Sequence, residues 1–356
     1  MRALVIVITL LLGLLPHASL RAGLYRTDGP NAGPEAGPDG SVEPFALDYF
    51  RTSVLPNVLK IALHDEANRN TPQRLEALQR LDALQQKERR GELTTEDRVN
   101  MSYYLLRLHN PQENQFATHA QKAFAVLFPT TREARDNFLA FSNMATVYQM
   151  LGETRSAVDM LQMALDVWPT QYPGFTPEQL QWFKRAEEAQ LKLLRARLRE
   201  RGQPADNVDD LFGVQFIGES GQYEAGTIAA AEKVKLPPDA EALVQQLILW
   251  MPGDTRLYWL LGELLNAQGK IEDAWNVMED CVYSRRYNSP LLKEHRQIVM
   301  AARQAQQPSP PQSWLPSVRQ LIIVGGVAGV IFVLLMYLQI RELRRRRQRA
   351  TAYRSH

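Results

Sequence analysis

The chain has 356 residues, which is room for one large or two ordinary domains, and 45% of them are hydrophobic, enough for a folded core. A single cysteine, Cys281, excludes an intramolecular disulfide and a zinc or redox site built from several cysteines. Residues 317–356 hold eight arginines and one acidic residue, so the body that precedes them is acidic, which argues against nucleic-acid binding by that body.

The first 44 residues divide into two segments that precede the helical part of the chain. Residues 1–22 have a basic start, a short apolar run and a small-residue exit, which predicts a secretory signal peptide cleaved after Ala22. An uncleaved signal anchor is the alternative. Residues 23–44 are rich in Gly, Pro, Asp and Asn, a composition that buries little apolar surface. We therefore expect a disordered spacer there.

From Phe45 onward the apolar spacing becomes helical, and residues 45–306 are predicted to form one all-α domain. An amphipathic helix begins with Pro72 at its first position and ends at Gly91. A later helix is expected to end at Pro129, because proline interrupts the hydrogen bonds of a helix. The next helix is expected to begin at Thr130, the first residue of a capping box.

A second capping box at Thr176 predicts a long helix that ends near Arg201. This helix is apolar on two sides, so we expect it to pack between two neighbours. Residues 202–224 change character and predict a short β-hairpin or a structured loop that covers a core edge, with a binding insertion as the functional alternative. A helix over residues 225–235 follows, and a last helix over 291–306 caps the domain.

Residues 138–171 and 255–288 repeat one pattern of helix, tight turn and helix, and eight positions match at a constant offset of 117 residues. Half of the pattern recurs from Ala240 to Pro252. The positions expected to pack the two clear copies are Phe141, Met144, Ala145, Tyr148, Gly152, Ala157, Leu161, Ala164, Pro169, Tyr258, Leu261, Gly262, Leu265, Gly269, Ala274, Met278 and Cys281.

These two copies resemble the tetratricopeptide repeat, a helix hairpin of about 34 residues. The resemblance implies an array of antiparallel helix hairpins that acts as a scaffold, with a groove along the first helices that binds proteins or peptides. Trp259 is either an aromatic anchor for such a partner or a packed core residue. The positions that the resemblance places in the groove are Leu139, Ser142, Thr146, Gln149, Met150, Arg256, Trp259, Glu263, Asn266 and Ala267.

The C-terminal part is predicted to anchor the chain in a membrane. Residues 307–316 form a proline-rich stalk, residues 319–340 a transmembrane helix, and residues 341–356 a basic tail. The positive-inside rule places this tail in the cytoplasm and the bulk of a single-pass protein in the periplasm or another extracytoplasmic space. Gly325 and Gly329 form a GxxxG motif, which offers a contact for a homodimer.

The sequence contains no recognisable motif for catalysis. Its six histidines match no metal-ligand spacing, and nucleophile-elbow, Walker and dinucleotide-binding motifs are absent from it. We therefore expect no enzyme, no cofactor and no metal site. The sequence favours an exported, membrane-anchored interaction scaffold. The alternative is a signalling or envelope-assembly accessory protein whose Arg-rich tail recruits a cytoplasmic partner or anionic lipid.

Overall fold

The computed structural model describes residues 24–29, 31, 33–37, 40–62, 70–108, 116–200, 207–306, 334–339 and 341. The chain divides into two compact units, Met1–Arg303 and Gln304–His356. The fold described below is that of the first unit.

This unit is all-helical, and its described residues contain no β-strand. Two π-helical turns, η2 (Phe50–Val54) and η3 (Asp280–Ser284), extend neighbouring helices. The α-helices are α2 (Leu47–Tyr49), α3 (Leu55–Ala62), α4 (Pro72–Arg90), α5 (Thr95–Arg107), α6 (Phe116–Glu133), α7 (Phe138–Met150), α8 (Thr154–Asp166), α9 (Pro177–Arg199), α10 (Ala230–Lys233), α11 (Ala240–Trp250), α12 (Thr255–Ala267), α13 (Ile271–Glu279) and α14 (Pro290–Gln306).

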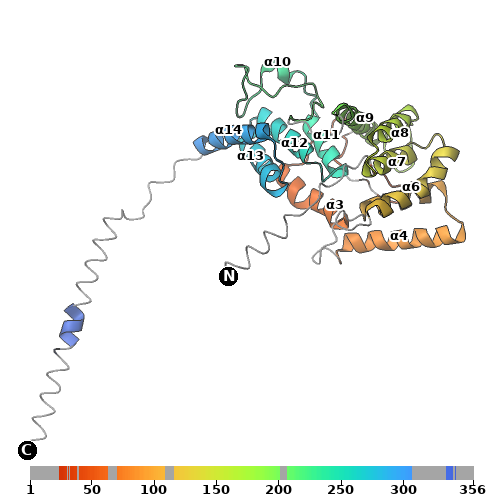
Figure 1. Cartoon of the computed structure of the whole chain (residues 1–356), viewed down its shortest axis with the longest axis horizontal. Coiled ribbons are helices and arrows are strands. Elements are labelled where there is room, and N and C mark those ends of the chain that lie inside the picture. Colours follow the sequence, from red (N-terminus) through yellow and green to blue (C-terminus); the bar gives the residue numbers. More distant parts are fainter. Residues whose placement is uncertain are drawn as a thin grey trace, which may run out of the picture. The chain divides into compact units, whose positions relative to one another are not determined.

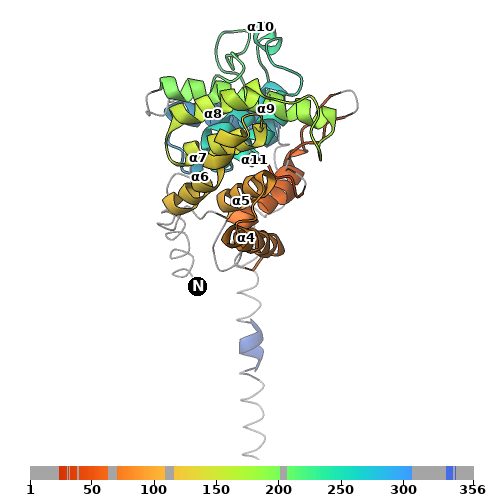
Figure 2. The same ribbon diagram turned by 90° about the vertical axis from the view of Figure 1, so that its right-hand side faces the viewer.

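Helices that follow one another in the sequence pack as adjacent pairs. The most extensive contacts join α7 to α8, α12 to α13 and α5 to α6. Further contacts join α6 to α7 and α8 to α9, so the succession from α4 to α9 can be followed in Figures 1 and 2. The long helix α9 contacts both α8 and α11, as its two apolar sides predict. The predicted all-α arrangement of packed helix pairs is thus confirmed.

The tight turns of the two predicted repeats depend on glycine. Gly152 follows α7 with a φ of 79°, and Gly269 follows α12 with a φ of 80°. L-residues with a Cβ atom rarely adopt this left-handed conformation, whereas glycine adopts it at no steric cost. The two glycine turns therefore lie at equivalent positions in the two repeats, separated by the offset of 117 residues found in the sequence.

Small residues let the two helices of a hairpin approach each other. A Cβ atom at Gly262 would lie 3.0 Å from Cγ of Met278, which belongs to the second helix of the same hairpin. The other predicted packing positions, the turn glycines aside, are buried, except for Tyr148 and Pro169, which are half-buried. The repeat pattern therefore marks the contact between paired helices.

The two predicted capping boxes have opposite outcomes. The Thr176 side chain accepts a hydrogen bond from the backbone N–H of Gln179 at 3.2 Å, and the box is complete. Thr130 instead lies buried inside α6, which continues past Pro129. The helix persists because it packs against α5 on one side and α7 on the other. The following helix, α7, is capped by Asn137.

Residues 207–224 form a structured loop, one of the two structures predicted for residues 202–224, and they contain no β-hairpin. A turn closes where the N–H of Gly218 donates to the carbonyl of Gln222 at 2.8 Å, without strand pairing beyond it. The helix predicted over 225–235 shortens to α10, because Gly226 has a φ of 75°. Figures 1 and 2 show α10 and its flanking loops projecting from the helices.

Part of the predicted spacer over residues 23–44 is integrated into the core. Leu24, Tyr25 and Val42 are buried among the apolar side chains of the helical unit. The expectation of a disordered spacer is therefore wrong for these residues. The average composition of the segment hides the few large apolar side chains that find partners in the helices.

None of the helices in the described part of the chain combines the length and apolar character needed to cross a bilayer. Residues 334–339 are helical with exposed side chains. The predicted signal peptide, the stalk, most of the predicted span at 319–340 and nearly all of the basic tail lie outside the described residues. Gly325 and Gly329 lie outside them as well.

Candidate functional site

The ten positions that were expected to line an open groove are all buried, with at most 8% of any residue exposed. They lie on α7 and α12, which are enclosed by other parts of the chain. The expectation of an open groove at these positions is therefore wrong. Neighbouring helices and two segments of the same chain without regular secondary structure pack against these helices.

The first covering segment comprises residues 24–29 and lies against α5 and α7. The N–H of Tyr25 donates to Oδ1 of Asn143 at 2.9 Å, and Nδ2 of Asn143 donates back to the carbonyl of Tyr25 at 3.0 Å. The N–H of Thr27 donates to Oδ1 of Asn100 at 2.7 Å. Because a carboxamide offers both a donor and an acceptor, it can pair with a peptide backbone as a neighbouring strand does. We call a helix carboxamide that hydrogen-bonds to the backbone of such a segment a carboxamide clamp.

The ring of Tyr25 fills an aromatic cage. The centroids of Phe183, Trp250, Phe138 and Trp168 lie 5.5, 5.8, 6.3 and 6.4 Å from its own. Edge-to-face and tilted contacts of this kind add to the burial of the ring itself. The N-terminal segment is thus anchored by both its backbone and its side chain.

A buried carboxyl lies beside this tyrosine. Glu187 of α9 is next to the side chains of Tyr25 and Ser142, but neither of its oxygens has a well-formed hydrogen bond to a protein atom. Burial raises the pKa of Glu187 to about 8, so the carboxyl is largely protonated at neutral pH. Ser142, which was expected to face a partner, instead faces this interior carboxyl.

The remainder of the segment is held at the edge of α5. Nη1 of Arg26 donates to the hydroxyl of Tyr104 at 3.0 Å, and that hydroxyl donates to Oδ2 of Asp28 at 2.8 Å. The Arg26 guanidinium also lies 5.6 Å from the ring centroid of Tyr103. These contacts are specific to the side chains, whereas the carboxamide clamps bind backbone atoms of any sequence.

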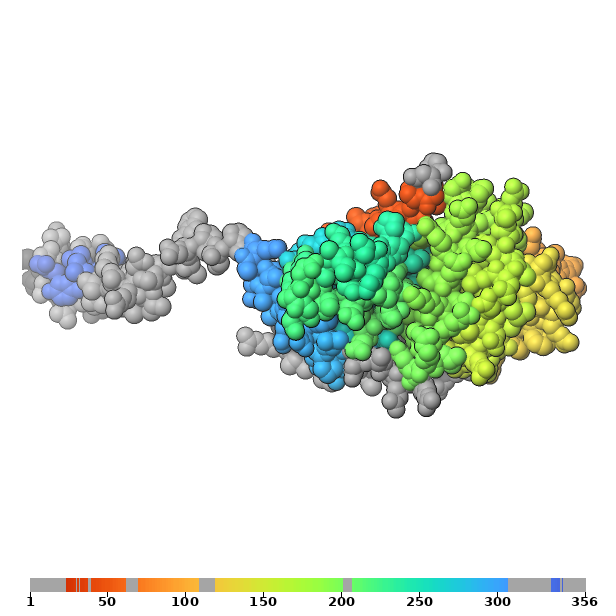
Figure 3. All heavy atoms as spheres, turned by 90° about the horizontal axis from the view of Figure 1, so that it is seen from above, coloured from red at the N-terminus to blue at the C-terminus, as the bar shows by residue number. Residues whose placement is uncertain are grey.

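The second covering segment comprises residues 223–226. It belongs to the loop that precedes α11 and packs against α12 and α14. Oδ1 of Asn266 accepts from the N–H of Gly226 at 2.7 Å, and Nδ2 of Asn266 donates to the carbonyl of Glu224 at 3.0 Å. The ring of Tyr223 stacks on His295 of α14 with 3.6 Å between centroids. Figure 3 shows this loop on the surface near α14.

Trp259 is a core residue. Its Nε1 donates to Oε1 of Glu263 at 2.6 Å, and Nδ1 of His295 lies 2.7 Å from the same oxygen. Burial and the neighbouring Glu263 carboxylate raise the pKa of Tyr223. Trp259, Glu263 and His295 are buried, and the half-buried Tyr223 joins the covering loop to them, so Trp259 offers no exposed surface to a partner in this arrangement.

A further clamp holds the chain just before α2. The N–H of Phe45 donates to Oε1 of Gln245 at 2.8 Å, and Nε2 of Gln245 donates to the carbonyl of Phe45 at 2.9 Å. Of the clamp residues, only Asn266 was among the predicted site residues; Asn100, Asn143 and Gln245 were missed. Each is a carboxamide at a buried helix position, and Asn143 and Gln245 lie in helices that are mostly apolar.

A buried ion network fixes the start of the same loop. Asp209 contacts Arg197 of α9 at 2.8 Å and Arg256 of α12 at 2.7 Å. Arg197 also pairs with Asp254, and Arg256 forms two hydrogen bonds to Glu200 at 2.7 and 2.9 Å. Arg256 was expected in the groove. It and Arg197 instead tie α9, α12 and the loop together.

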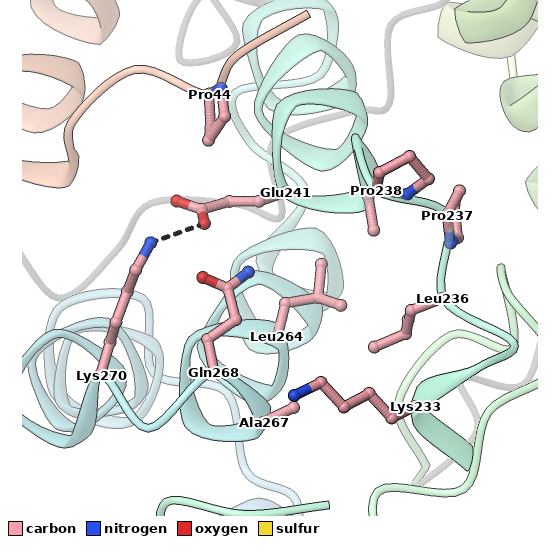
Figure 4. Close-up of a pocket in the computed structure, with 11 residues that line it drawn as sticks. Pro44, Lys233, Leu236, Pro237, Pro238, Glu241, Leu264, Ala267, Gln268 and Lys270 are labelled. Atoms are coloured by element: carbon pink, nitrogen blue, oxygen red, sulfur yellow. Dashed lines mark hydrogen bonds and ion pairs between the residues drawn. The ribbon is translucent and has the colours of Figure 1, made fainter. Parts of the chain in front are cut away.

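A hollow of about 370 Å³ lies beside the C-terminal end of α12 (Figure 4). Nζ of Lys270 and Oε2 of Glu241 form an ion pair of 3.0 Å on one side of it, so these two charges offset each other. Ala267, one of the predicted groove residues, contributes to its wall. The lining comprises Pro44, Lys233, Leu236, Pro237, Pro238, Ala240, Glu241, Leu264, Ala267, Gln268 and Lys270.

Within the described ranges, no three histidine, cysteine or carboxylate side chains gather to hold a metal ion. No family model, no curated protein and no solved structure matches this chain. The arrangement that the structure does show is a set of packed helix pairs whose carboxamide side chains hold backbone outside regular secondary structure.

Proposed function

We propose that this chain is a membrane-anchored scaffold that binds other proteins on the exported side of the membrane, with helix hairpins of the tetratricopeptide type. Support for the hairpins comes from the consecutive packed helix pairs and from the constant offset between residues 138–171 and 255–288. Support for export and anchoring comes from the sequence patterns of residues 1–22 and 319–340.

The observation that carries the proposal is the use of carboxamide side chains on helices to hold backbone outside regular secondary structure. Asn143, Gln245 and Asn266 each engage both a backbone N–H and a backbone carbonyl of a segment without regular secondary structure. A surface that pairs with both a backbone N–H and a backbone carbonyl supplies what an extended segment of another protein needs for binding.

The test is affinity purification of the full chain from detergent-solubilised membranes after cross-linking in intact cells. We expect a specific partner to be cross-linked to the helical unit within residues 45–306. Recovery of no partner above the level of an unrelated anchored protein would contradict the proposal.

A matched variant separates this function from recruitment by the tail. Exchange of Arg344, Arg345, Arg346 and Arg347 for lysine keeps the positive charge that sets topology but removes guanidinium contacts. The scaffold proposal expects unchanged partner recovery from this variant. Loss of the partner would instead favour an accessory protein that acts through its cytoplasmic tail.

A further inference from the structure

We propose that the surface formed by α5 and α7, together with the aromatic cage that α9 and α11 help to form, is a binding site for an extended peptide with tyrosine followed by arginine, and that residues 24–29 occupy it as an internal ligand. The inference deepens the scaffold function by naming a ligand class, and it rests on that function. We call this surface, with its clamps Asn100 and Asn143, the segment site.

The segment site recognises the backbone at alternate residues. Asn143 binds both backbone groups of Tyr25, and Asn100 binds the N–H of Thr27 at 2.7 Å. An extended chain presents alternate residues to the same side, so two clamps at this spacing suit an extended peptide. The second Nδ2 contacts of Asn143, to Ser102 at 3.1 Å and the carbonyl of Val99 at 3.3 Å, hold the clamp in place.

The segment site also selects side chains. The aromatic cage encloses a tyrosine, the Tyr103 and Tyr104 rings accommodate the following arginine, and the Tyr104 hydroxyl binds an acidic group two residues after that. The ligand class is therefore an extended peptide with the order tyrosine, basic residue, any residue, acidic residue. Buried aromatic and arginine anchors contribute most of the affinity in such interfaces.

Residues 24–29 resemble a bound ligand in how they are held. They form neither helix nor strand, and their hydrogen bonds to the helices run through side chains of α5 and α7. Their attachment to the rest of the chain gives them a high effective concentration at the segment site. A free peptide therefore competes poorly with residues 24–29 as long as the Tyr25 ring occupies the aromatic cage.

The experiment uses the full chain in detergent with the substitution Tyr25→Ala, which empties the aromatic cage. A fluorescent synthetic peptide with the sequence of residues 23–29 is added in trans. We expect the peptide to bind the variant at least about tenfold more tightly than it binds the wild-type chain. At saturation it raises the unfolding midpoint of the variant by about 4 °C or more.

The midpoint shift stays informative if the variant is unstable, because a ligand that binds the native state stabilises it by mass action. Two double variants locate the site. Tyr25→Ala with Asn143→Ala removes the clamp of the segment site and loses peptide binding. Tyr25→Ala with Asn266→Ala removes the clamp of the other hairpin and keeps peptide binding.

Three outcomes overturn the inference. The first is an equal response to a peptide of scrambled sequence, and the second is unchanged binding after Asn143→Ala is added. The third is a wild-type chain that forms dimers by exchanging residues 24–29, because the occupant would then be a second copy. The synthetic peptide could also show no binding to the Tyr25→Ala variant while the wild-type chain still recovers a partner from membranes. That result would contradict the inference and leave the scaffold function in place.

Discussion

Glu187 shows how burial determines the chemistry of a single side chain in this protein. Its pKa rises from 4.5 to about 8 because the carboxyl is fully buried in α9. Between these two values the folded chain keeps a proton at Glu187 that the unfolded chain has lost. The free energy of unfolding therefore decreases as the pH rises through this window, and the loss levels off above the folded-state pKa.

The substitution Glu187→Gln tests this assignment. The wild-type chain should lose about 3 kcal/mol of unfolding free energy from this group between pH 5 and pH 8, whereas the uncharged amide should lose none. Urea unfolding of both chains at the two pH values measures the difference. Parallel pH profiles for the two chains would contradict a buried, protonated carboxyl.

Cys281 provides a second test at the residue scale. Its thiol is completely buried at the end of the second repeat, and burial raises its pKa. Because the thiolate is the reactive form, a maleimide reagent should leave Cys281 unmodified in the native chain and modify it in urea. Mass spectrometry of both samples measures this, and rapid labelling of the native chain would show that the thiol is accessible.

Individual residues of the repeats show what the sequence could predict about the site. The packing positions follow from local periodicity, so Ala157 and Leu161 are buried as expected. Ser142 is buried near Tyr25, more than a hundred residues away in the sequence, and Trp259 is buried against His295, more than thirty residues away. No local pattern reveals either contact. The groove positions were therefore placed on the correct helices but given the wrong surroundings.

The hairpin turns are the elements that the sequence predicted best. Gly152 and Gly269 both adopt positive φ angles after the first helix of each repeat. Substitution of either residue by alanine should destabilise the chain by about 1–2 kcal/mol, because the added Cβ atom is strained in this conformation. Thermal unfolding measures the loss.

Gln268→Ala is the matched control for the second turn. Gln268 precedes Gly269 and has an ordinary helical backbone with a φ of −89°, so its replacement should change stability little. If Gly269→Ala is no more destabilising than Gln268→Ala, the turn does not depend on glycine.

Elements whose ends are set by tertiary contacts were harder to predict. The capping box at Thr176 forms because all its atoms lie within one turn. The same motif at Thr130 does not form, because α6 gains packing on both sides by continuing past Pro129. The loop around Gly226 has a backbone conformation set by Asn266, forty residues away in the sequence.

At the scale of the whole molecule, the clamps connect parts of the chain that are distant in sequence. The pairing of Tyr25 with Asn143 spans 118 residues, and that of Phe45 with Gln245 spans 200. Such contacts close large loops, which costs entropy that the buried aromatic rings and backbone hydrogen bonds offset. The N-terminal segments thereby join the first and later helix pairs into one unit.

The predicted topology can be tested on the intact protein. A protease added outside spheroplasts should digest the helical unit, while an epitope attached after His356 stays protected until the membrane is permeabilised. Protection of the helical unit together with digestion of the epitope would reverse the proposed orientation.

Hydrogen exchange of the full chain tests most directly the central claim that helix side chains hold extended backbone. We predict that the amides of Tyr25, Thr27 and Gly226 exchange far more slowly than those of a free peptide. Asn143→Ala should release only residues 24–29, and Asn266→Ala only the loop around Gly226. Exchange at free-peptide rates in the wild-type chain, or equal release of both segments by either substitution, would contradict the account.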